Sequence, residues 1–579
     1  MIYIKNKDFK LNVKRTWKYI KYAKKNLLGY GLISITESII SIILPLLSAE
    51  IILNISNSSI KQLILTAIAL FIVNIILYIV IYFKSLFYQR IYRKTMVSLQ
   101  KAIAEEILKL EIQEIEKNTS GLFIDRLNKD TQDMSGLFME YTYWISYVLA
   151  NIGILITLFI LNKYMFVYAT ITSIIVYLVD KKRLHKQFEV QKQLKHTQES
   201  KTGITSELVR GIKDLKLLNA NETILQQVSN KIEETTKKEI NIINIKNFYN
   251  YLENNIKAFT DLILVILGCY LYENGLLTIP TFIIIYNYQT KIKDLLIGVG
   301  KISEYNKSFN LAANRVYELI EDSKFKKEQF GKVEVKELQG NIKFQNITFG
   351  YTKIKVLKDM TFEIEANEKI AFVGKSGAGK TTIFNLISKL YKQDKGKILL
   401  DKYNIEELSC SSIRKNIALI TQNPYIFNLS IKENLLLASE NSTMKEIREA
   451  CRTACIDDYI MSLPNKYETI VGENGTILSG GQKQRLAIAR ALLMKTKIIM
   501  FDEATSALDN ETQSQIQQAI NNLKEKHTVL IIAHRLSTII DCDKIFVVNN
   551  GKIVDSGTHQ ELLKRCNYYK DLYNRDLEK

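Results

Sequence analysis

The chain has 579 residues, with 79 Lys and Arg against 60 Asp and Glu and a net charge of +19. Its 47% hydrophobic and 24% charged residues exclude a disordered chain, a collagen and a small disulfide scaffold. Six cysteines without a C-x-x-C pair argue against a structural zinc site or a disulfide framework. The basic balance indicates an anionic partner, such as nucleic acid, a nucleotide or a membrane surface.

Long apolar runs occupy the first 300 residues. Residues 63–83 carry no charge, and this run is as long as the roughly 20 residues that a helix needs to cross a bilayer. A buried helix of that length in a water-soluble protein would show a polar stripe. We therefore predict six membrane spans, of which charged residues interrupt the last. Their approximate ranges are 27–55, 63–83, 138–161, 164–179, 258–272 and 279–300.

Lys and Arg are distributed unevenly among the segments that flank these spans. The first 25 residues hold eight Lys and one Arg against one Asp, and the long connections 84–137 and 180–257 are rich in charges of both signs, with many Lys and Arg. The connections after the first, third and fifth spans hold at most one Lys each. Basic connections stay in the cytoplasm, so we expect the N-terminus, both long connections and the C-terminal half there. The long connections have helical periodicity and are expected to extend the membrane helices into the cytosol.

The pattern changes at about residue 333, where short β-rich runs alternate with helical segments. This alternation predicts an α/β domain with a mainly parallel sheet. The expected strands are 342–344, 369–373, 497–501, 528–532 and 544–548. We expect a transmembrane domain over 1–320, a charged linker over 321–334 and the α/β domain over 335–579.

A glycine-rich loop of the form G-x-x-x-x-G-K-[ST] follows the apolar run 370–373 and opens a helical run at residue 382. Glycines let backbone N–H groups surround phosphates, and the helix N-terminus adds a favourable dipole. Lys380 is expected to reach the β- and γ-phosphates and Thr381 to ligate Mg²⁺. The loop consists of Gly374, Lys375, Ser376, Gly377, Ala378, Gly379, Lys380 and Thr381, and Thr382 follows it.

Two further strand ends carry candidate catalytic groups. Asp502 and Glu503 follow an apolar strand, where Asp502 can hold Mg²⁺ and Glu503 can polarise an attacking water. His534 follows the expected strand 528–532 and could contact the γ-phosphate in the same crevice. Together with the glycine-rich loop, these residues predict a nucleotide hydrolase.

The order of these elements resembles the ATP-binding cassette (ABC) family. The deciding stretch is Leu478, Ser479, Gly480, Gly481 and Gln482, which looks like the family signature. The resemblance implies that this segment and Asp509 serve the ATP of a partner cassette, so two cassettes form the active unit. It also implies that Tyr351 stacks on adenine, that Gln422 senses Mg²⁺ and that His534 is the switch histidine.

Six spans before one cassette extend the resemblance to type IV ABC exporters. Residues 119–127 look like the first coupling helix and residues 211–216 like the region of the second. The implied fold is a six-helix transmembrane domain followed by an α/β cassette. The implied activity is ATP-driven export across a bacterial cytoplasmic membrane, with ATP and Mg²⁺ as cofactors. A homodimer is favoured because both Glu503 and His534 are present, and a heterodimer stays open.

The substrate class is open among peptides, drugs and lipids. Alternatives are a lipid or lipid-linked flippase, an importer on an exporter scaffold, a regulatory channel or receptor, and a soluble ABC ATPase. The uncharged run 63–83 argues against the soluble class and against nucleic acid as the partner; membrane lipids are expected instead. Intramembrane polar residues are functional candidates, although each could also pair with a neighbouring helix. These candidates are Glu37, Asn74, Asn151 and Asp261.

Overall fold

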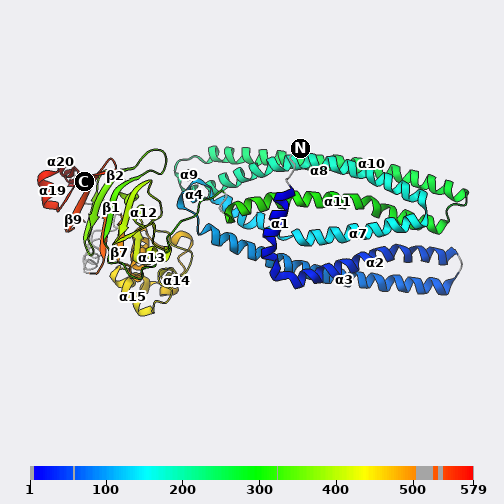
Figure 1. Cartoon of the computed structure of the whole chain (residues 1–579), viewed down its shortest axis with the longest axis horizontal. Helices are drawn as coiled ribbons and strands as arrows, with labels where there is room; N and C mark the ends of the chain where they lie inside the picture. Colours follow the sequence, from blue (N-terminus) through cyan, green and yellow to red (C-terminus); the bar gives the residue numbers. More distant parts are fainter. Residues whose placement is uncertain (1–5, 57–58, 322–323, 504–525, 533–538, 578–579) are drawn as a thin grey trace. The chain divides into compact units, whose positions relative to one another are not determined.

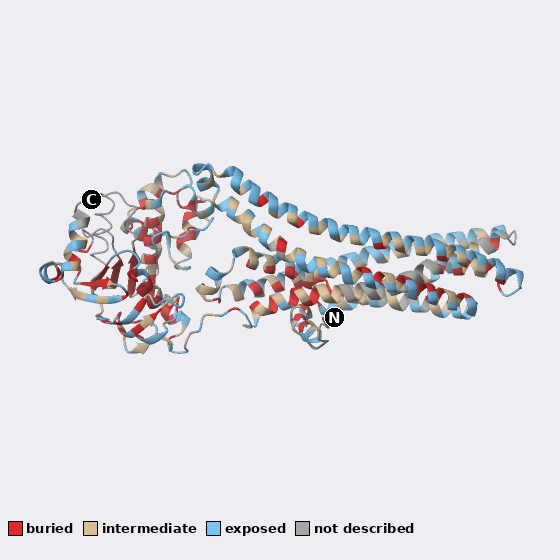
Figure 2. Cartoon of the chain, turned by 90° about the horizontal axis from the view of Figure 1, so that it is seen from above, coloured by how far each residue is buried: buried red, intermediate tan, exposed pale blue. Residues whose placement is uncertain are grey.

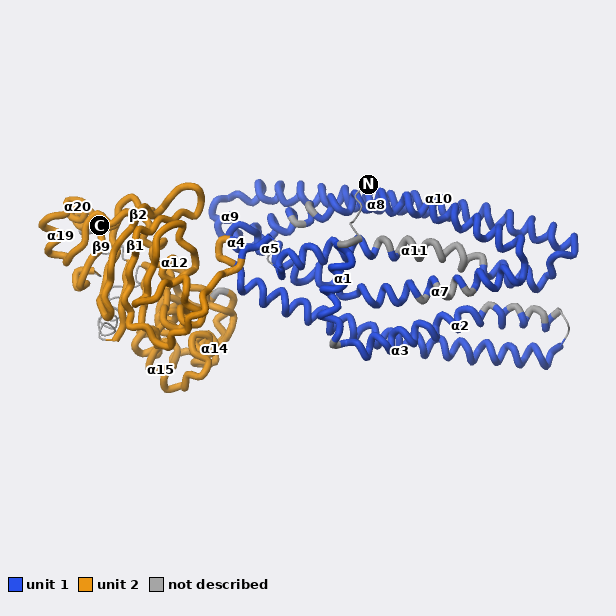
Figure 3. The backbone as a smooth tube through the Cα atoms, viewed as in Figure 1, with its two compact units in different colours: residues 1–110, 114–326 blue, residues 111–113, 327–579 orange. Residues whose placement is uncertain are grey.

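The computed structural model describes residues 6–56, 59–321, 324–503, 526–532 and 539–577 (Figure 1). It divides into two compact units, coloured separately in Figure 3. The first comprises residues 1–110 and 114–326, and the second comprises residues 111–113 and 327–579. The described part of the first unit is helical, and the second combines sheets with helices.

Seven long helices form the frame of the first unit. They are α1 (Asn6–Ile20), α2 (Lys24–Ser56), α3 (Ile60–Ile107), α7 (Leu137–Leu161), α8 (Lys163–Arg210), α10 (Asn221–Glu273) and α11 (Ile279–Ile320). Short helical segments join them: η1 (Lys21–Ala23), α4 (Ile112–Lys117), α5 (Ser120–Asp125), the π-helix η2 (Arg126–Asp130), α6 (Thr131–Ser135) and α9 (Ile212–Leu217).

Four helices in the described part of the chain are long and apolar enough to cross a membrane. They are Lys24–Ser48 within α2, and the whole of α3, α8 and α10. Helix α3 has 48 residues, which at 1.5 Å per residue is about 72 Å, more than twice the ~30 Å hydrocarbon core. Such helices must continue beyond the bilayer. A shorter apolar stretch, Ile279–Tyr288, begins α11.

Helix α1 is fixed to the last helix of the same unit by polar side chains. The Asn12 amide donates to the side-chain oxygens of Asn310 at 2.5 Å and Asn314 at 2.7 Å. Thr16 and Tyr317 share a hydrogen bond of 2.9 Å between their hydroxyls. Because Asn12 and Thr16 are buried, these bonds stabilise the packing of α1 on α11.

The second unit contains two sheets. The first has the order β2-β1-β4-β5 and is antiparallel; the second has the order β10-β9-β3-β8-β7-β6, with β10 antiparallel at its edge. The mainly parallel sheet expected from sequence is the six-stranded one, and the antiparallel sheet was not predicted. The strands are β1 (Ile342–Phe349), β2 (Leu357–Ile364), β3 (Lys369–Val373), β4 (Lys395–Leu400), β5 (Tyr403–Asn404), β6 (Ile417–Ile420), β7 (Ile498–Asp502), β8 (Thr528–Ile532), β9 (Lys544–Asn549) and β10 (Lys552–Gly557).

The six-stranded sheet is buried on both faces. In β3, Ile370 and Phe372 belong to one hydrophobic cluster, whereas Ala371 and Val373 belong to the other. Figure 2 shows buried residues of this unit both on its strands and on the helices around them. Helices cover the sheets: α12 (Lys380–Ile387), α13 (Cys410–Asn416), α14 (Ile431–Leu436), α15 (Met444–Thr453), α16 (Asp457–Ser462), α17 (Gly480–Leu493), α19 (His559–Arg565) and α20 (Asn567–Leu577), with short η3 (Lys466–Glu468) and η4 (Glu473–Gly475).

Candidate functional site

The glycine-rich loop joins the end of β3 to the start of α12. Gly377 and Gly379 have φ of +78° and +105°, which favours residues without a Cβ. A Cβ on Gly379 would lie 2.7 Å from the Leu357 side chain, so the loop also needs glycine for space. The loop can therefore turn its backbone N–H groups toward an anion, as a phosphate cradle requires.

Lys380 carries the loop's most deeply placed charge. Its ammonium donates to the backbone carbonyls of Gly374 at 2.8 Å and Lys375 at 3.2 Å, and its residue is 6% exposed. Burial lowers the pKa of Lys380, and the carboxylates of Glu503 and Asp502 oppose that shift. A cation is thus held inside the loop, where it can stabilise phosphate charge.

Three strand and helix ends bring the predicted magnesium and water ligands together. Thr381 donates through its hydroxyl to Asp502 at 3.2 Å. The amide of Gln422, two residues after β6, donates to the Glu503 carboxylate at 2.8 Å. Oxygen ligands of this kind suit Mg²⁺, which prefers carboxylate and hydroxyl oxygens with retained waters. The residues present therefore fit the metal that the sequence predicts.

Glu503 has an unusual backbone conformation for its residue type. Its φ is +52°, in the left-handed region, and its N–H donates to the Ile532 carbonyl at 3.0 Å. Holding a non-glycine residue there costs on the order of 1–3 kcal/mol, and such residues cluster at functional sites. The hydrogen bond to β8 fixes the carboxylate beside Gln422.

Tyr351 lies beyond β1 with its ring partly exposed and its hydroxyl anchored. Its hydroxyl donates to Thr382 at 3.2 Å and accepts from the Asn385 amide at 3.1 Å. Its ring packs edge-on against Phe349 and Tyr391. The residue is 37% exposed, so its side chain is accessible to a planar base.

The signature segment begins α17. Ser479 is its N-cap and forms a capping box with Gln482: the Ser479 N–H donates to Gln482 at 2.8 Å, and the Gln482 N–H donates back at 3.3 Å. Gly480 and Gly481 follow, and Leu478 is buried. In the described part of the chain, no hydrogen bond joins this segment to the glycine-rich loop. The start of a helix carries unpaired N–H groups and the positive end of the dipole, which favour an anion.

Sequence reasoning missed Tyr568, which lies against the glycine-rich loop. The Lys375 N–H donates to the Tyr568 hydroxyl at 3.4 Å, and the Lys375 ammonium lies 5.9 Å from the centre of its ring. Adjacent Tyr569 is fully buried and anchors α20. No motif marks Tyr568, because 193 residues separate it from Lys375. His534 and Asp509 lie outside the described residues.

The structure gives different surroundings to the candidate substrate residues of the first unit. Glu37 of α2 forms an ion pair with Lys84 of α3, the first charge after the run 63–83. The Asn74 amide donates to the Leu70 carbonyl of its own helix at 2.9 Å. Asp261 is half-buried on α10. The Asn151 side chain lies outside the described residues.

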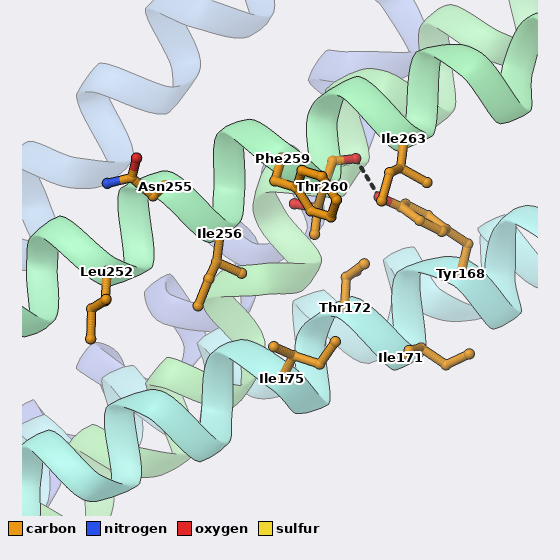
Figure 4. A pocket seen from close by; sticks show the side chains of 10 residues that line it. All are labelled: Tyr168, Ile171, Thr172, Ile175, Leu252, Asn255, Ile256, Phe259, Thr260 and Ile263. Carbon is orange, nitrogen blue, oxygen red and sulfur yellow. Dashed lines mark hydrogen bonds between the residues drawn. The ribbon is translucent and has the colours of Figure 1, made fainter.

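A mostly apolar groove of about 450 Å³ lies between α8 and α10 (Figure 4). The Tyr168 hydroxyl donates to the Thr260 carbonyl across the groove, so a single polar bridge joins its walls in the view. The lining residues are Tyr168, Ile171, Thr172, Ile175, Leu252, Asn255, Ile256, Phe259, Thr260 and Ile263.

Known proteins match both units. Residues 27–292 match the family model described as ABC transporter transmembrane region, and residues 357–506 match that described as ABC transporter. An ATP-dependent lipid A-core flippase of Blochmanniella pennsylvanica is 30% identical over 491 residues, covering 83% of this chain and 82% of the relative. A Staphylococcus aureus protein, named provisionally as a multidrug export ATP-binding/permease protein, is 39% identical over 323 residues, covering 55% and 56%.

Among solved structures, a bacterial Atm1-family ABC exporter with ATP bound superposes with a TM-score of 0.85. It covers 95% of this chain and 98% of its own, at 22% identity, which establishes a shared fold. The fold class predicted from sequence, a helical transmembrane domain followed by an α/β cassette, is confirmed. The chain therefore belongs to the ABC transporter family, with a transmembrane region and an ATP-binding cassette fused in one polypeptide.

Proposed function

We propose that this chain is an ATP-driven exporter that works as a homodimer in a bacterial cytoplasmic membrane. The cluster of Thr381, Asp502, Glu503 and Gln422 carries the proposal, because it assembles the groups that ATP hydrolysis needs. ATP binding would close two cassettes, and hydrolysis would let them separate, which would reorient the paired membrane units. The distribution of Lys and Arg supports a cytoplasmic N-terminus and cassette.

The residues of the cassette divide the work. The loop from Gly374 to Thr382 would bind the phosphates, with Lys380 supplying charge, and Tyr351 would pack on the base. Glu503 would orient and deprotonate the attacking water, and His534 would stabilise the γ-phosphate. Leu478 to Gln482, together with Asp509, would complete the site of the partner cassette.

Magnesium would be held by Thr381, Asp502 and Gln422. When bound, the ion would neutralise charge on the β- and γ-phosphate oxygens. The chain's own contribution is positional, because the Thr381 to Asp502 hydrogen bond already aligns two of these ligands. Chelation by EDTA should therefore abolish hydrolysis, and added Mg²⁺ should restore it.

Two substitutions separate binding from turnover. Glu503→Gln should retain ATP binding while lowering kcat by at least about 100-fold, since it keeps the hydrogen-bonding shape but removes the base. Lys380→Ala should weaken ATP binding at least about tenfold, because it removes the buried cation. ATP titration and phosphate release from the purified protein in lipid nanodiscs would measure both. Wild-type turnover in Glu503→Gln would contradict the assignment of Glu503.

We infer that the substrate is an amphipathic lipid or drug. The names of the two relatives support this class, and so does the groove between α8 and α10, whose isoleucine and phenylalanine side chains suit an acyl chain or a flat hydrophobe. A reconstituted protein should show ATPase stimulation by lipids or hydrophobic drugs and no stimulation by soluble peptides. Stimulation by peptides alone would overturn the inference.

A further inference from the structure

Helix α17 holds the loop that contains Gln422. The Gln484 side-chain amide donates to the Gln422 backbone carbonyl at 3.1 Å. Farther along the helix, the Arg490 guanidinium donates to the Tyr425 carbonyl at 2.9 Å and to the Asn434 carbonyl at 3.0 Å. Two side chains of one helix thus bind three carbonyls that lie about 60 residues earlier in the chain, two in the loop and one in α14.

The hydrogen bond from Gln484 to the Gln422 carbonyl is donated by a buried side chain. Gln484 is 2% exposed, and its side-chain oxygen has no donor within the described ranges. A buried amide that loses its hydrogen bond cannot replace it with water, so the bond to Gln422 is expensive to break. Because the side-chain oxygen has no described partner, the bond to the Gln422 carbonyl is the one described hydrogen bond of this side-chain amide.

The bond between Gln484 and Gln422 connects the signature segment with the candidate catalytic residue Glu503. Ser479, which caps α17, belongs to the segment expected to touch the ATP of a partner cassette. Gln484 lies five residues later, about 7.5 Å along the helix axis. Gln422 then donates to Glu503 at 2.8 Å. One rigid helix and two hydrogen bonds therefore lead from the signature segment to the candidate base.

We propose that Gln484 is a positioning residue that transmits a contact at Ser479 to the Gln422–Glu503 pair of the same cassette. A shift of α17 moves the Gln422 carbonyl, and because the carbonyl and the side chain belong to one residue, it also moves the amide that holds Glu503. The inference rests on the proposed function, since it requires two cassettes. It adds a route by which occupation of one ATP site sets the geometry of the other.

A double-mutant cycle tests this route in the full chain reconstituted in nanodiscs. Gln484→Met removes the amide and keeps the length of the side chain. We expect kcat to fall about fivefold or more, with the Kd for ATP within about twofold of wild type, because the glycine-rich loop is untouched. In the Ser479→Ala background, Gln484→Met should lower kcat little further, because the contact at Ser479 that Gln484 is proposed to transmit is already lost.

The matched control is Thr496→Val, which removes another buried oxygen that has no described partner. Thr496→Val should lower kcat only slightly. In the double variant with Ser479→Ala, the two fold-changes in kcat should multiply, as expected for independent residues. Gln482→Ala provides a milder signature lesion if Ser479→Ala leaves too little activity to compare. Melting temperatures of all variants would show that the proteins are folded.

The outcomes are distinguishable. If Gln484→Met keeps wild-type kcat, or if its effect multiplies with both signature lesions, Gln484 is merely structural and the inference fails. If the wild-type protein shows no Mg²⁺-dependent ATP hydrolysis, the proposed function itself fails. A loss in Gln484→Met that disappears in the Ser479→Ala background supports the route.

Discussion

At the scale of single residues, Glu37 and Lys84 of the first unit form a partly buried ion pair. Glu37 and Lys84 are 24% and 12% exposed at their side chains. The Lys84 ammonium also lies 4.4 Å from the centre of the Tyr143 ring and 5.8 Å from that of Tyr30. Removing one partner would leave a charge in a poorly hydrated cluster, which costs more than the pair itself contributes.

We therefore expect Glu37→Gln and Lys84→Met each to destabilise the protein by about 1–3 kcal/mol. The double variant should be more stable than either single variant, because neither Glu37 nor Lys84 then stands without the other. Thermal unfolding in detergent measures these losses. Thr36→Val, which changes an exposed side chain on the same helix, is the control. Losses that simply add in the double variant would contradict this account.

Residues within motifs were predictable, and residues joined by folding alone were not. Thr381, Asp502, Gln422 and Glu503 were named from sequence as parts of one site, and hydrogen bonds connect them in pairs. Their roles stay predictions. Lys84 was not expected beside Glu37, because the pairing depends on the register of two helices against each other. That register is set by packing along their whole length.

At the scale of elements, the turn between β9 and β10 depends on two residues in the left-handed region. Asn550 and Gly551 have φ of +48° and +80°, which is the arrangement of a tight hairpin turn. A Cβ on Gly551 would lie 2.0 Å from the Val356 carbonyl oxygen, beside the start of β2. The hairpin therefore needs glycine at 551 both for its φ and for its closeness to a second strand.

Gly551→Ala should lower the stability of the cassette by more than about 1 kcal/mol, since left-handed strain alone costs roughly that much. Asn550→Gly should be nearly neutral, because glycine adopts the same φ without strain. Differential scanning calorimetry of the full chain would compare the two variants. An unchanged cassette transition in Gly551→Ala would show that the backbone relaxes at this turn.

Strands that are buried on both faces were easier to predict from the sequence than strands with one exposed face. The expected strands 369–373 and 528–532 coincide with β3 and β8, which are buried throughout and so read as continuous apolar runs. Strand β2 has charged or polar residues between buried ones, and β4 begins with exposed residues. Such short mixed patterns resemble loops, so most of the antiparallel sheet escaped the sequence analysis.

At the scale of the whole molecule, the proposed dimer places each signature segment opposite the glycine-rich loop of the other chain. Substitutions of Lys380 and Ser479 in the same chain then affect two different ATP sites. The same two substitutions in opposite chains affect one and the same site. In a dimer of one Lys380→Ala chain and one Ser479→Arg chain, both lesions share one site and leave the other intact.

We expect each single variant to be inactive as a homodimer and the mixed dimer to regain measurable hydrolysis. Its rate should stay below half of the wild-type rate, because the Ser479→Arg chain supplies Glu503 to the unaltered site and has lost its own contact at Ser479. Co-expression with two affinity tags and sequential purification isolates the mixed dimer, and phosphate release measures its activity. A doubly tagged wild-type dimer is the control. A mixed dimer as inactive as its parents would indicate that each signature segment serves its own chain.

The bonds between α1 and α11 have a consequence for biosynthesis. Asn12 and Thr16 find their partners only at Asn310, Asn314 and Tyr317, about 300 residues later. At a translation rate of roughly 5–20 residues per second, α1 must wait at least about 15 s for them. During that time its polar face is exposed to other surfaces at the membrane. The membrane unit can close only when its last helix leaves the ribosome, shortly before the cassette begins to emerge.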